Sequence, residues 1–376
     1  MFIICIEPFI IYIMIYRYLG KSGLRISVFG YGNWINAAAD QLNVIQQAQL
    51  LSMRECRKHG INFFDTAERY GFGQGELIFG NCLKELKWDR KDYVITTKIQ
   101  EIGKGVNHKM LSRKHVIEGV TASLKRLQLD YVDIVYAHRY DQETPIEEVC
   151  RAFNWVIEKG WAFYWGTSYW TPQQIMEAMA CCDRCHLIKP IVEQPEYNLL
   201  VRKNVEVDLV PLFTNYGMGC TSWSPLAGGF LTGKYNKSVP KGSRYDDKIG
   251  NVLGQNVGKM YQGKYKFDDI KSTLIEFSEF SKSLGFAPSQ VALAWLVKNT
   301  DVTSCMLGAS KASQITENVK SLELVKKWNK DIESKISEIF KNDPETLVNW
   351  RFYDKNPQRR LASVHFNGSE EFMEIS

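Results

Sequence analysis

Hydrophobic and polar positions between residues 26 and 307 alternate between two spacings. Short runs rich in β-branched and aromatic residues, typical of strands, are separated by longer segments whose apolar residues recur with the period of a helix. The pattern predicts eight strands, at residues 26–34, 61–66, 93–99, 131–138, 162–167, 191–194, 220–223 and 302–307. It predicts helices at residues 41–59, 75–86, 112–127, 145–159 and 172–181, with further helices between and after the later strands.

This alternation predicts the fold class. Eight βα units in series without a break in composition indicate an α/β protein with a closed (β/α)8 TIM barrel, and the alternative is an open doubly wound sheet. We expect the barrel to span residues 17–343, between an apolar N-terminal extension at 1–16 and a polar C-terminal tail at 344–376. One connection, at residues 226–267 after the seventh strand, is far longer than ~15 residues, so we interpret it as a binding loop or a solvated loop.

The apolar N-terminal extension has three readings besides a membrane anchor. It falls short of the ~20 residues that cross a bilayer, and Glu7 and Pro8 interrupt it. It also lacks the basic flank and small-residue cleavage site of a signal peptide. A strand of a hairpin, a contact with a partner and an erroneous gene start all remain open.

Composition and charge exclude several classes of protein. A content of 45% hydrophobic and 24% charged residues is that of a globular chain rather than a disordered one. The net charge of +5 is spread along the chain, so we expect no nucleic-acid partner. Nine cysteines without regular spacing favour a reducing compartment, and we expect a cytoplasmic protein.

One group of cysteines matches a haem-attachment pattern. The segment from Cys182 to His186 reads CxxCH, and Cys181 adds a fourth residue with metal-site spacing. Haem attachment belongs to an oxidising compartment, and we regard zinc binding here as unlikely. We therefore interpret these cysteines as structural and expect no metal site.

The ends of the predicted strands carry the candidate chemistry, because barrel enzymes react at the carboxyl ends of their strands. Asp65, Lys98 and His138 end three successive strands, and Tyr70 follows Asp65 on a turn rich in glycine. A lysine near a phenol lowers the phenol's pKa, and a carboxylate holds the ammonium in place. Tyr70 would then act as a general acid on a carbonyl oxygen that His138 orients. The alternative is a buried ion pair beside a core histidine.

These residues and several longer motifs resemble the aldo-keto reductases, from about Tyr16 to about Asp343. The family motifs are the Asp65, Tyr70, Lys98 and His138 set, Gly166-Thr167-Ser168, Trp223-Ser224-Pro225-Leu226-Ala227 and Gly308-Ala309-Ser310 with Gln314, Glu317 and Asn318. Residues 18–24, 112–115, 127–133 and 160–166 look like the branch that contains the β subunits of voltage-gated potassium channels. Animal channel subunits of that branch carry asparagine where this chain has His138.

The resemblance implies a bound NADP(H) and assigns residues to it. For the nicotinamide end these are Gly32, Asn33, Trp34, Ser168, Gln194 and Trp223; for the pyrophosphate Ser224, Leu226, Lys234 and Arg244; for the adenosine end Gly308, Ser310, Lys311, Gln314, Glu317 and Asn318. Asn33 departs from the threonine that is usual in the channel branch. Independently, a strand-Gly-Ser turn into a helix presents N–H groups to an anion. Lys311 and Arg244 favour NADP over NAD.

Two functions follow from the resemblance. The first is NADPH-dependent reduction of small aldehydes or ketones to alcohols. The second is a redox-sensing cytoplasmic β subunit of a voltage-gated potassium channel, held at the membrane through the channel. The branch also implies a homotetramer.

Overall fold

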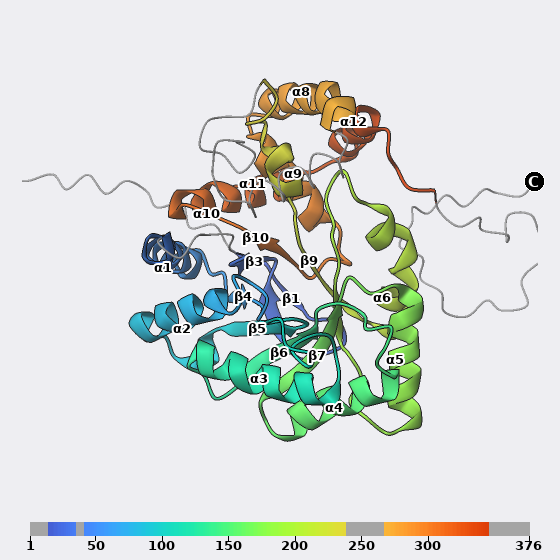
Figure 1. The fold of residues 1–376 in the computed structure, drawn as a ribbon. Helices are drawn as coiled ribbons and strands as arrows, with labels where there is room; N and C mark the ends of the chain where they lie inside the picture. The colour runs from blue at the N-terminus through green and yellow to red at the C-terminus, as the bar shows by residue number, and fades with distance from the viewer. Residues whose placement is uncertain (1–13, 35–40, 238–266, 346–376) are drawn as a thin grey trace, which may run out of the picture. The chain divides into compact units, whose positions relative to one another are not determined.

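The computed structural model describes residues 14–34, 41–237 and 267–345, and the fold they form is a closed barrel of eight parallel strands (Figure 1). The strands are β3 (Phe29–Gly32), β4 (Phe63–Asp65), β5 (Val94–Ile99), β6 (Val132–Ala137), β7 (Ala162–Ser168), β8 (Val192–Gln194), β9 (Gly219–Ser222) and β10 (Ser304–Leu307). Each strand pairs with the next, and β10 closes the barrel against β3. The predicted (β/α)8 fold is confirmed.

Helices cover the outside of the barrel. They are α1 (Leu42–Lys58), α2 (Gln74–Leu86), α3 (Arg113–Leu127), α4 (Ile146–Glu158), α5 (Pro172–Arg184), α6 (Val210–Tyr216), α8 (Phe267–Ser283), α9 (Pro288–Lys298), α10 (Ala312–Val319), α11 (Ser321–Lys327) and α12 (Lys330–Phe340), with short helical turns at Arg90–Asp92, Asn204–Asp208 and Ala227–Thr232. From α1 to α5 each helix packs against the next around the barrel (Figure 1). Within the described residues, no helix is long and apolar enough to cross a membrane.

The first predicted strand, at residues 26–34, is wrong as a single element. Its beginning forms β2 (Arg25–Ser27), which pairs antiparallel with β1 (Tyr16–Tyr18), and only β3 enters the barrel. The break occurs at Ser27. Its hydroxyl donates to the carbonyl of Phe29 at 2.6 Å, while its backbone N–H donates to the side chain of Asn62 at 2.8 Å. Side-chain bonds of this kind divert the backbone from a continuous ladder.

The β1–β2 hairpin packs against the apolar interior of the barrel. Leu19 and Ile26 belong to one buried cluster with inward-facing strand residues, which are Phe63, Val94, Ile134, Tyr136, Val192 and Met306. Several of these strand residues are the first of their strands, so the hairpin covers the end where the strands begin. A Cβ on Gly30 would lie only 2.3 Å from Met306, so glycine there makes room for the packed interior.

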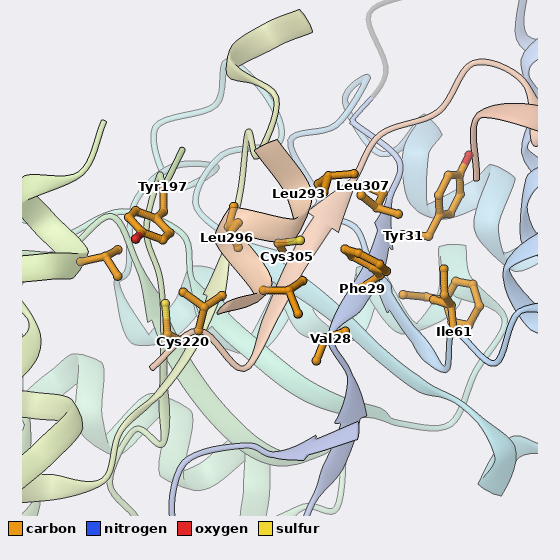
Figure 2. Packing of buried hydrophobic residues seen from close by; sticks show 14 of the residues in the cluster. Val28, Phe29, Tyr31, Ile61, Tyr197, Cys220, Leu293, Leu296, Cys305 and Leu307 are labelled. Atoms are coloured by element: carbon orange, nitrogen blue, oxygen red, sulfur yellow. The ribbon is translucent and has the colours of Figure 1, made fainter. Parts of the chain in front are cut away.

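A second and larger apolar cluster lies between the strands and the helices. In Figure 2, Phe29 and Leu307 from neighbouring strands lie near Leu293 of α9 and near Ile61. Alternate strand residues therefore face two different cores, one inside the barrel and one under the helices. This period of two decides which side chains reach the end of the barrel where the strands stop.

Candidate active site

The predicted strand-end residues continue the inward-facing positions of their strands. Asp65 lies two residues after Phe63, and His138 two residues after Tyr136, and both of these earlier residues belong to the barrel interior. The same spacing applies to Gly32, Lys98, Ser168, Gln194, Trp223 and Gly308. Because side chains alternate along a strand, this shared position directs all of these residues to one rim of the barrel.

Lys98 is fully buried at this rim, and its ammonium has three hydrogen-bond partners. It donates to a carboxylate oxygen of Asp65, to the backbone carbonyl of Thr66 at 2.8 Å and to the hydroxyl of Tyr70 at 3.3 Å. An ammonium has three donors, so every one of them is used. The predicted contacts of Lys98 with Asp65 and Tyr70 are therefore present.

The second oxygen of Asp65 accepts hydrogen bonds from two residues, one on the neighbouring strand β5 and one across the barrel on β8. The hydroxyl of Thr96 donates to it at 2.6 Å, and the side-chain amide of Gln194 donates at 3.2 Å. A buried carboxylate is costly unless its lone pairs are satisfied. Thr96 and Gln194 thus satisfy the lone pairs of this buried oxygen beside Lys98, a role that the sequence analysis did not give to Gln194.

Charge and burial act in opposite directions on the Lys98–Tyr70 pair. Burial by itself lowers the pKa of Lys98, but the interactions with Asp65 and Tyr70 reverse this, and the net direction is upward. Burial raises the pKa of Tyr70, and this outweighs the lowering by Lys98. The predicted effect of Lys98 on Tyr70 is therefore correct in direction, but the pKa of Tyr70 as a whole is raised rather than lowered. In the fold as it stands, Lys98 is charged and Tyr70 is protonated at neutral pH.

His138 is buried next to this pair, and its ring faces that of Tyr70 edge-on with 6.0 Å between the centroids. Its Nδ1 has no hydrogen-bond partner among the described residues. Burial, followed by the charges of Lys98 and Arg139, lowers the pKa of His138 well below its ordinary value. The imidazole is therefore neutral at neutral pH and carries one N–H donor.

Arg139 is a rim residue that the sequence analysis missed. Its guanidinium donates to the backbone carbonyl of His138 at 2.6 Å and lies 4.9 Å from the ring centroid of Tyr169. Its charge lowers the pKa of both Tyr70 and His138. The available signal was a cation directly after the histidine that ends a predicted strand.

Three of the residues assigned to the nicotinamide, Ser168, Gln194 and Trp223, lie on β7, on β8 and directly after β9. The hydroxyl of Ser168 donates to the backbone carbonyl of Gln194 at 3.0 Å, and Trp223 packs near Tyr169 with 5.9 Å between ring centroids. Tyr169 and Ser224 both have positive φ, 61° and 54°. Residues other than glycine adopt such angles rarely, and they do so most often at functional sites.

Asn33 and Trp34 differ in how they are placed after β3. The amide of Asn33 is buried and donates to the side chain of Gln49 at 3.2 Å and to the carbonyl of Gly75 at 2.7 Å. Trp34 is 39% exposed. Asn33 thus fixes the loop against the neighbouring helices, whereas Trp34 presents its ring to solvent.

Most of the described residues assigned to the phosphates and the adenosine are exposed or half-buried. Lys234 is exposed with its ammonium 4.6 Å from the ring centroid of Tyr235, and Leu226 is half-buried. Arg244 and most of the long loop after β9, the seventh strand of the barrel, lie outside the described residues. Lys311 is exposed beside Gly308, where an added Cβ would meet no atom within 4 Å.

The turn before α10 differs from the expectation of N–H groups that are open to an anion. The backbone N–H groups of Ser310 and Lys311 both donate to the side-chain oxygen of Gln314, at 2.8 and 3.2 Å. Glutamine at this position closes a capping box, which satisfies the N–H groups within the helix itself. Of the other two residues assigned here, Glu317 pairs with Lys320 at 2.9 Å, and Asn318 is buried.

The side chains at this rim carry chemical groups suited to binding a dinucleotide. Exposed Trp34 offers a ring for stacking, and Lys234 and Lys311 offer exposed cations for phosphate groups. The open space at Gly308 admits a close approach of a ligand to the backbone. The buried Nδ1 of His138, which has no partner in the described part of the chain, marks a polar rim rather than an apolar core.

Comparisons with known proteins identify the family. The model of the aldo/keto reductase family matches residues 29–337. A protein of Arabidopsis thaliana named probable voltage-gated potassium channel subunit beta is 45% identical over 340 residues, which cover 90% of this chain and all of that protein. A protein of the same name from Oryza sativa subsp. japonica is 44% identical over 340 residues, again 90% of this chain and all of the relative.

A third relative agrees with these two. A protein of Schizosaccharomyces pombe named putative voltage-gated potassium channel subunit beta is 45% identical over 332 residues, which cover 88% of this chain and 94% of that protein. Both the family match and the relatives span nearly the whole barrel. The chain therefore belongs to the aldo/keto reductase family.

Proposed function

We propose that this protein reduces small aldehydes and ketones to alcohols with NADPH. The observation that carries the proposal is the buried contact of the Lys98 ammonium with both the Asp65 carboxylate and the Tyr70 hydroxyl, beside a neutral His138. Each of these residues alone has a structural explanation. Together at one barrel rim they form a site for transferring a proton.

The roles of the four residues follow from their charges. The chemistry that a bound reduced dinucleotide supplies is a hydride for the carbonyl carbon. Tyr70, held protonated by burial, donates its proton to the carbonyl oxygen. Lys98 stabilises the phenolate that remains, and Asp65 keeps the ammonium in place. The single N–H donor of neutral His138 orients and polarises the carbonyl oxygen.

The residues of the other strand ends would hold the cofactor. Ser168 bonds to Gln194, and Trp223 packs near Tyr169, which follows Ser168 in the chain, so these three residues would share the nicotinamide, with Trp34 as a further stacking residue. Lys234 and Lys311 supply charge for the phosphates, and Gln314 would release the N–H groups of Ser310 and Lys311 when an anion takes its place.

The test of this function is a Tyr70→Phe variant. The expected result is loss of aldehyde reduction together with unchanged affinity for NADPH, measured by cofactor fluorescence, because the phenol donates the proton but does not hold the dinucleotide. Wild-type turnover by Tyr70→Phe would remove Tyr70 from the mechanism. Failure of the wild-type protein to bind NADPH would remove the proposal as a whole.

Cofactor preference tests the phosphate end separately. We expect the preference for NADPH over NADH to weaken when Lys311 and Arg244 are both replaced by alanine, because each cation neutralises part of the phosphate charge. The matched control is Lys341→Ala, a lysine after α12 that is not assigned to the cofactor. An unchanged ratio of the two dissociation constants in the double variant would show that the adenosine end is wrongly assigned.

A second candidate function is a cytoplasmic β subunit of a voltage-gated potassium channel. It is favoured by the names of the relatives, which match at 44–45% identity over their whole or nearly whole lengths. The two functions are compatible, since a partner that prefers one cofactor state turns a reductase into a sensor. Such a subunit would be a cyclic homotetramer, so light scattering that gives one 43.3 kDa chain at micromolar concentration would contradict it.

A further inference from the structure

A cluster of thiols lies between helices α4 and α5, outside the barrel and apart from the candidate active site. It contains Cys150 of α4 and three cysteines at the end of α5, which are Cys181, Cys182 and Cys185. The sequence pattern alone favours a structural role for the last three. In the fold, however, a cysteine and a carboxylate from a second helix join them.

The three outermost groups have the spacing of a ligand set. A carboxylate oxygen of Glu147 and the sulfur atoms of Cys181 and Cys185 all lie within 4.8 Å of one another. The two cysteines are four residues apart and therefore share one face of the helical end of α5. Glu147 reaches them from the first turn of α4, so the set spans two packed helices.

Cys150 is placed to complete the set. It lies three residues after Glu147 on the same face of α4, and its sulfur contacts the backbone carbonyl of Ala178 on α5 at 3.7 Å. The pattern is Glu-x-x-Cys on one helix facing Cys-x-x-x-Cys on the next.

We propose that Glu147, Cys150, Cys181 and Cys185 bind a zinc ion. Zinc takes four ligands in a tetrahedron, with sulfur about 2.3 Å and carboxylate oxygen about 2.1 Å from the metal. That geometry puts ligand atoms roughly 3.5–4 Å apart, so Glu147, Cys181 and Cys185, whose ligand atoms lie within 4.8 Å of one another, need only small side-chain movements to bind. Cys150, on the adjoining turn of α4, would have to turn its thiol toward them. Thiolates select zinc over magnesium or calcium, which prefer oxygen.

The surroundings supply both an outer partner and an entry path. The guanidinium of Arg151 donates to Glu147 at 2.8 Å and holds the carboxylate at the cluster. Outer partners of this kind orient metal ligands. Glu147 is exposed, Cys185 is half-buried and Cys181 is buried, so the ligands lead inward from the surface. Zinc binds cysteine as the thiolate, so binding releases protons and strengthens with rising pH.

Cobalt is the probe for this site, because tetrahedral thiolate coordination gives Co²⁺ an intense visible absorption. The full-length chain, stripped of metal by a chelator and kept reduced, is titrated with Co²⁺ and then with Zn²⁺. The expected result is a tetrahedral cobalt spectrum with sulfur charge-transfer bands that saturates at one ion per chain and disappears when Zn²⁺ displaces it.

Two variants and one control locate the ion. Cys185→Ser and Glu147→Gln, both at accessible positions, should each weaken binding at least about tenfold, since even outer partners of metal ligands are worth 10–100-fold. Cys82→Ser, a buried thiol on α2 away from the cluster, should leave the titration unchanged. Circular dichroism checks that every variant is folded.

Three outcomes would overturn the proposal. The wild type could show only the octahedral spectrum of loosely bound Co²⁺, or the tetrahedral spectrum could persist in folded Cys185→Ser. The third outcome is a chain that binds no Co²⁺ because its cluster thiols form a disulfide even in the presence of the reductant. None of these depends on carbonyl reduction, so the zinc site stands or falls independently of the proposed function.

Discussion

The two ends of the barrel use the same strand positions for opposite purposes. Along β5 the inward-facing residues run from Val94, which packs with the hairpin, through Thr96 to Lys98 at the rim. Along β6 they run from Ile134 to Tyr136, with His138 next. Alternate residues of each strand thus form an apolar cluster inside the barrel where the strands begin and a charged cluster at the rim where they end. Within a strand, only the identity of the side chain separates packing from chemistry.

The two ends also differ in how their residues depend on one another. At the apolar end each side chain contributes its own buried surface, and removal of one leaves a cavity. At the rim Asp65 and Lys98 are buried charges that tolerate burial only as a pair. Substitutions at the apolar end should therefore cost stability alone, and substitutions at the rim should cost stability and function together.

The largest effect is expected for Lys98→Met. Methionine fills similar space without charge and leaves Asp65 buried and uncompensated, which costs about 3–5 kcal/mol in the free energy of unfolding. Carbonyl reduction should be lost as well, because Tyr70 loses the cation that stabilises its phenolate. Urea unfolding and an aldehyde-reduction assay measure the two effects. The double variant Asp65→Asn/Lys98→Met should recover stability but not activity; equal instability of both variants would show that the pair is not coupled.

His138→Asn should separate chemistry from stability at the same rim. We expect reduction to slow by about 10²–10⁴-fold, the range for loss of a group positioned for proton transfer or polarisation. Cofactor affinity should remain close to that of the wild type, because His138 is not assigned to the dinucleotide. Single-turnover kinetics at saturating NADPH measure this effect. An unchanged rate would make His138 a packing residue.

Ile134→Ala gives the matching test at the apolar end. Truncation of a fully buried isoleucine costs about 2–5 kcal/mol through lost contacts and the cavity that remains. The rate of reduction per folded molecule should not change, because the substitution removes no charge from the rim. Urea unfolding together with active-site titration separates a smaller fraction of folded protein from a lower rate per active site. A lower rate per active site would mean that interior packing positions the rim residues.

The sequence predicts the barrel well because its signals are local. Each strand-like run is short, and the period of two identifies Asp65, Lys98 and His138 as inward-facing strand ends without knowledge of any contact. The split of the first run could not be read in the same way. It depends on Ser27 bonding to Asn62, which lies 35 residues away in the sequence.

The net pKa values of the site residues also could not be predicted from the sequence. A pairwise argument gives the sign of the effect of Lys98 on Tyr70, but the net pKa depends on how deeply both groups are buried. Likewise, Gln194 bonds Asp65, and Gln314 caps the turn that was expected to face an anion. These partners become visible only when the strands and loops are assembled.

The smallest effect we predict is a change in how stability depends on pH. Folding lowers the pKa of His138 well below the value of about 6.5 that it has in the unfolded chain. Below pH 6.5 the unfolded state therefore binds a proton that the folded state does not, and stability falls as pH falls, by about 1.4 kcal/mol per unit. His138→Asn should remove this contribution between pH 6.5 and 5.5.

A second buried group, Glu193, affects the stability of the wild type in the opposite direction, so the effect of His138 must be measured by comparison with a variant. Burial raises the pKa of its carboxyl to about 7, so the folded state binds an extra proton between about pH 4.5 and 7, and stability rises as pH falls. In the wild type the effects of His138 and Glu193 on the slope of stability against pH oppose each other. The contribution of His138 is therefore the difference between the slope of the wild type and the slope of His138→Asn. Urea unfolding at a series of pH values measures it, with Ile134→Ala as the control that lowers stability equally at every pH. Equal slopes in the wild type and His138→Asn would mean that His138 titrates alike in the folded and unfolded chains, and that the rim does not hold it neutral.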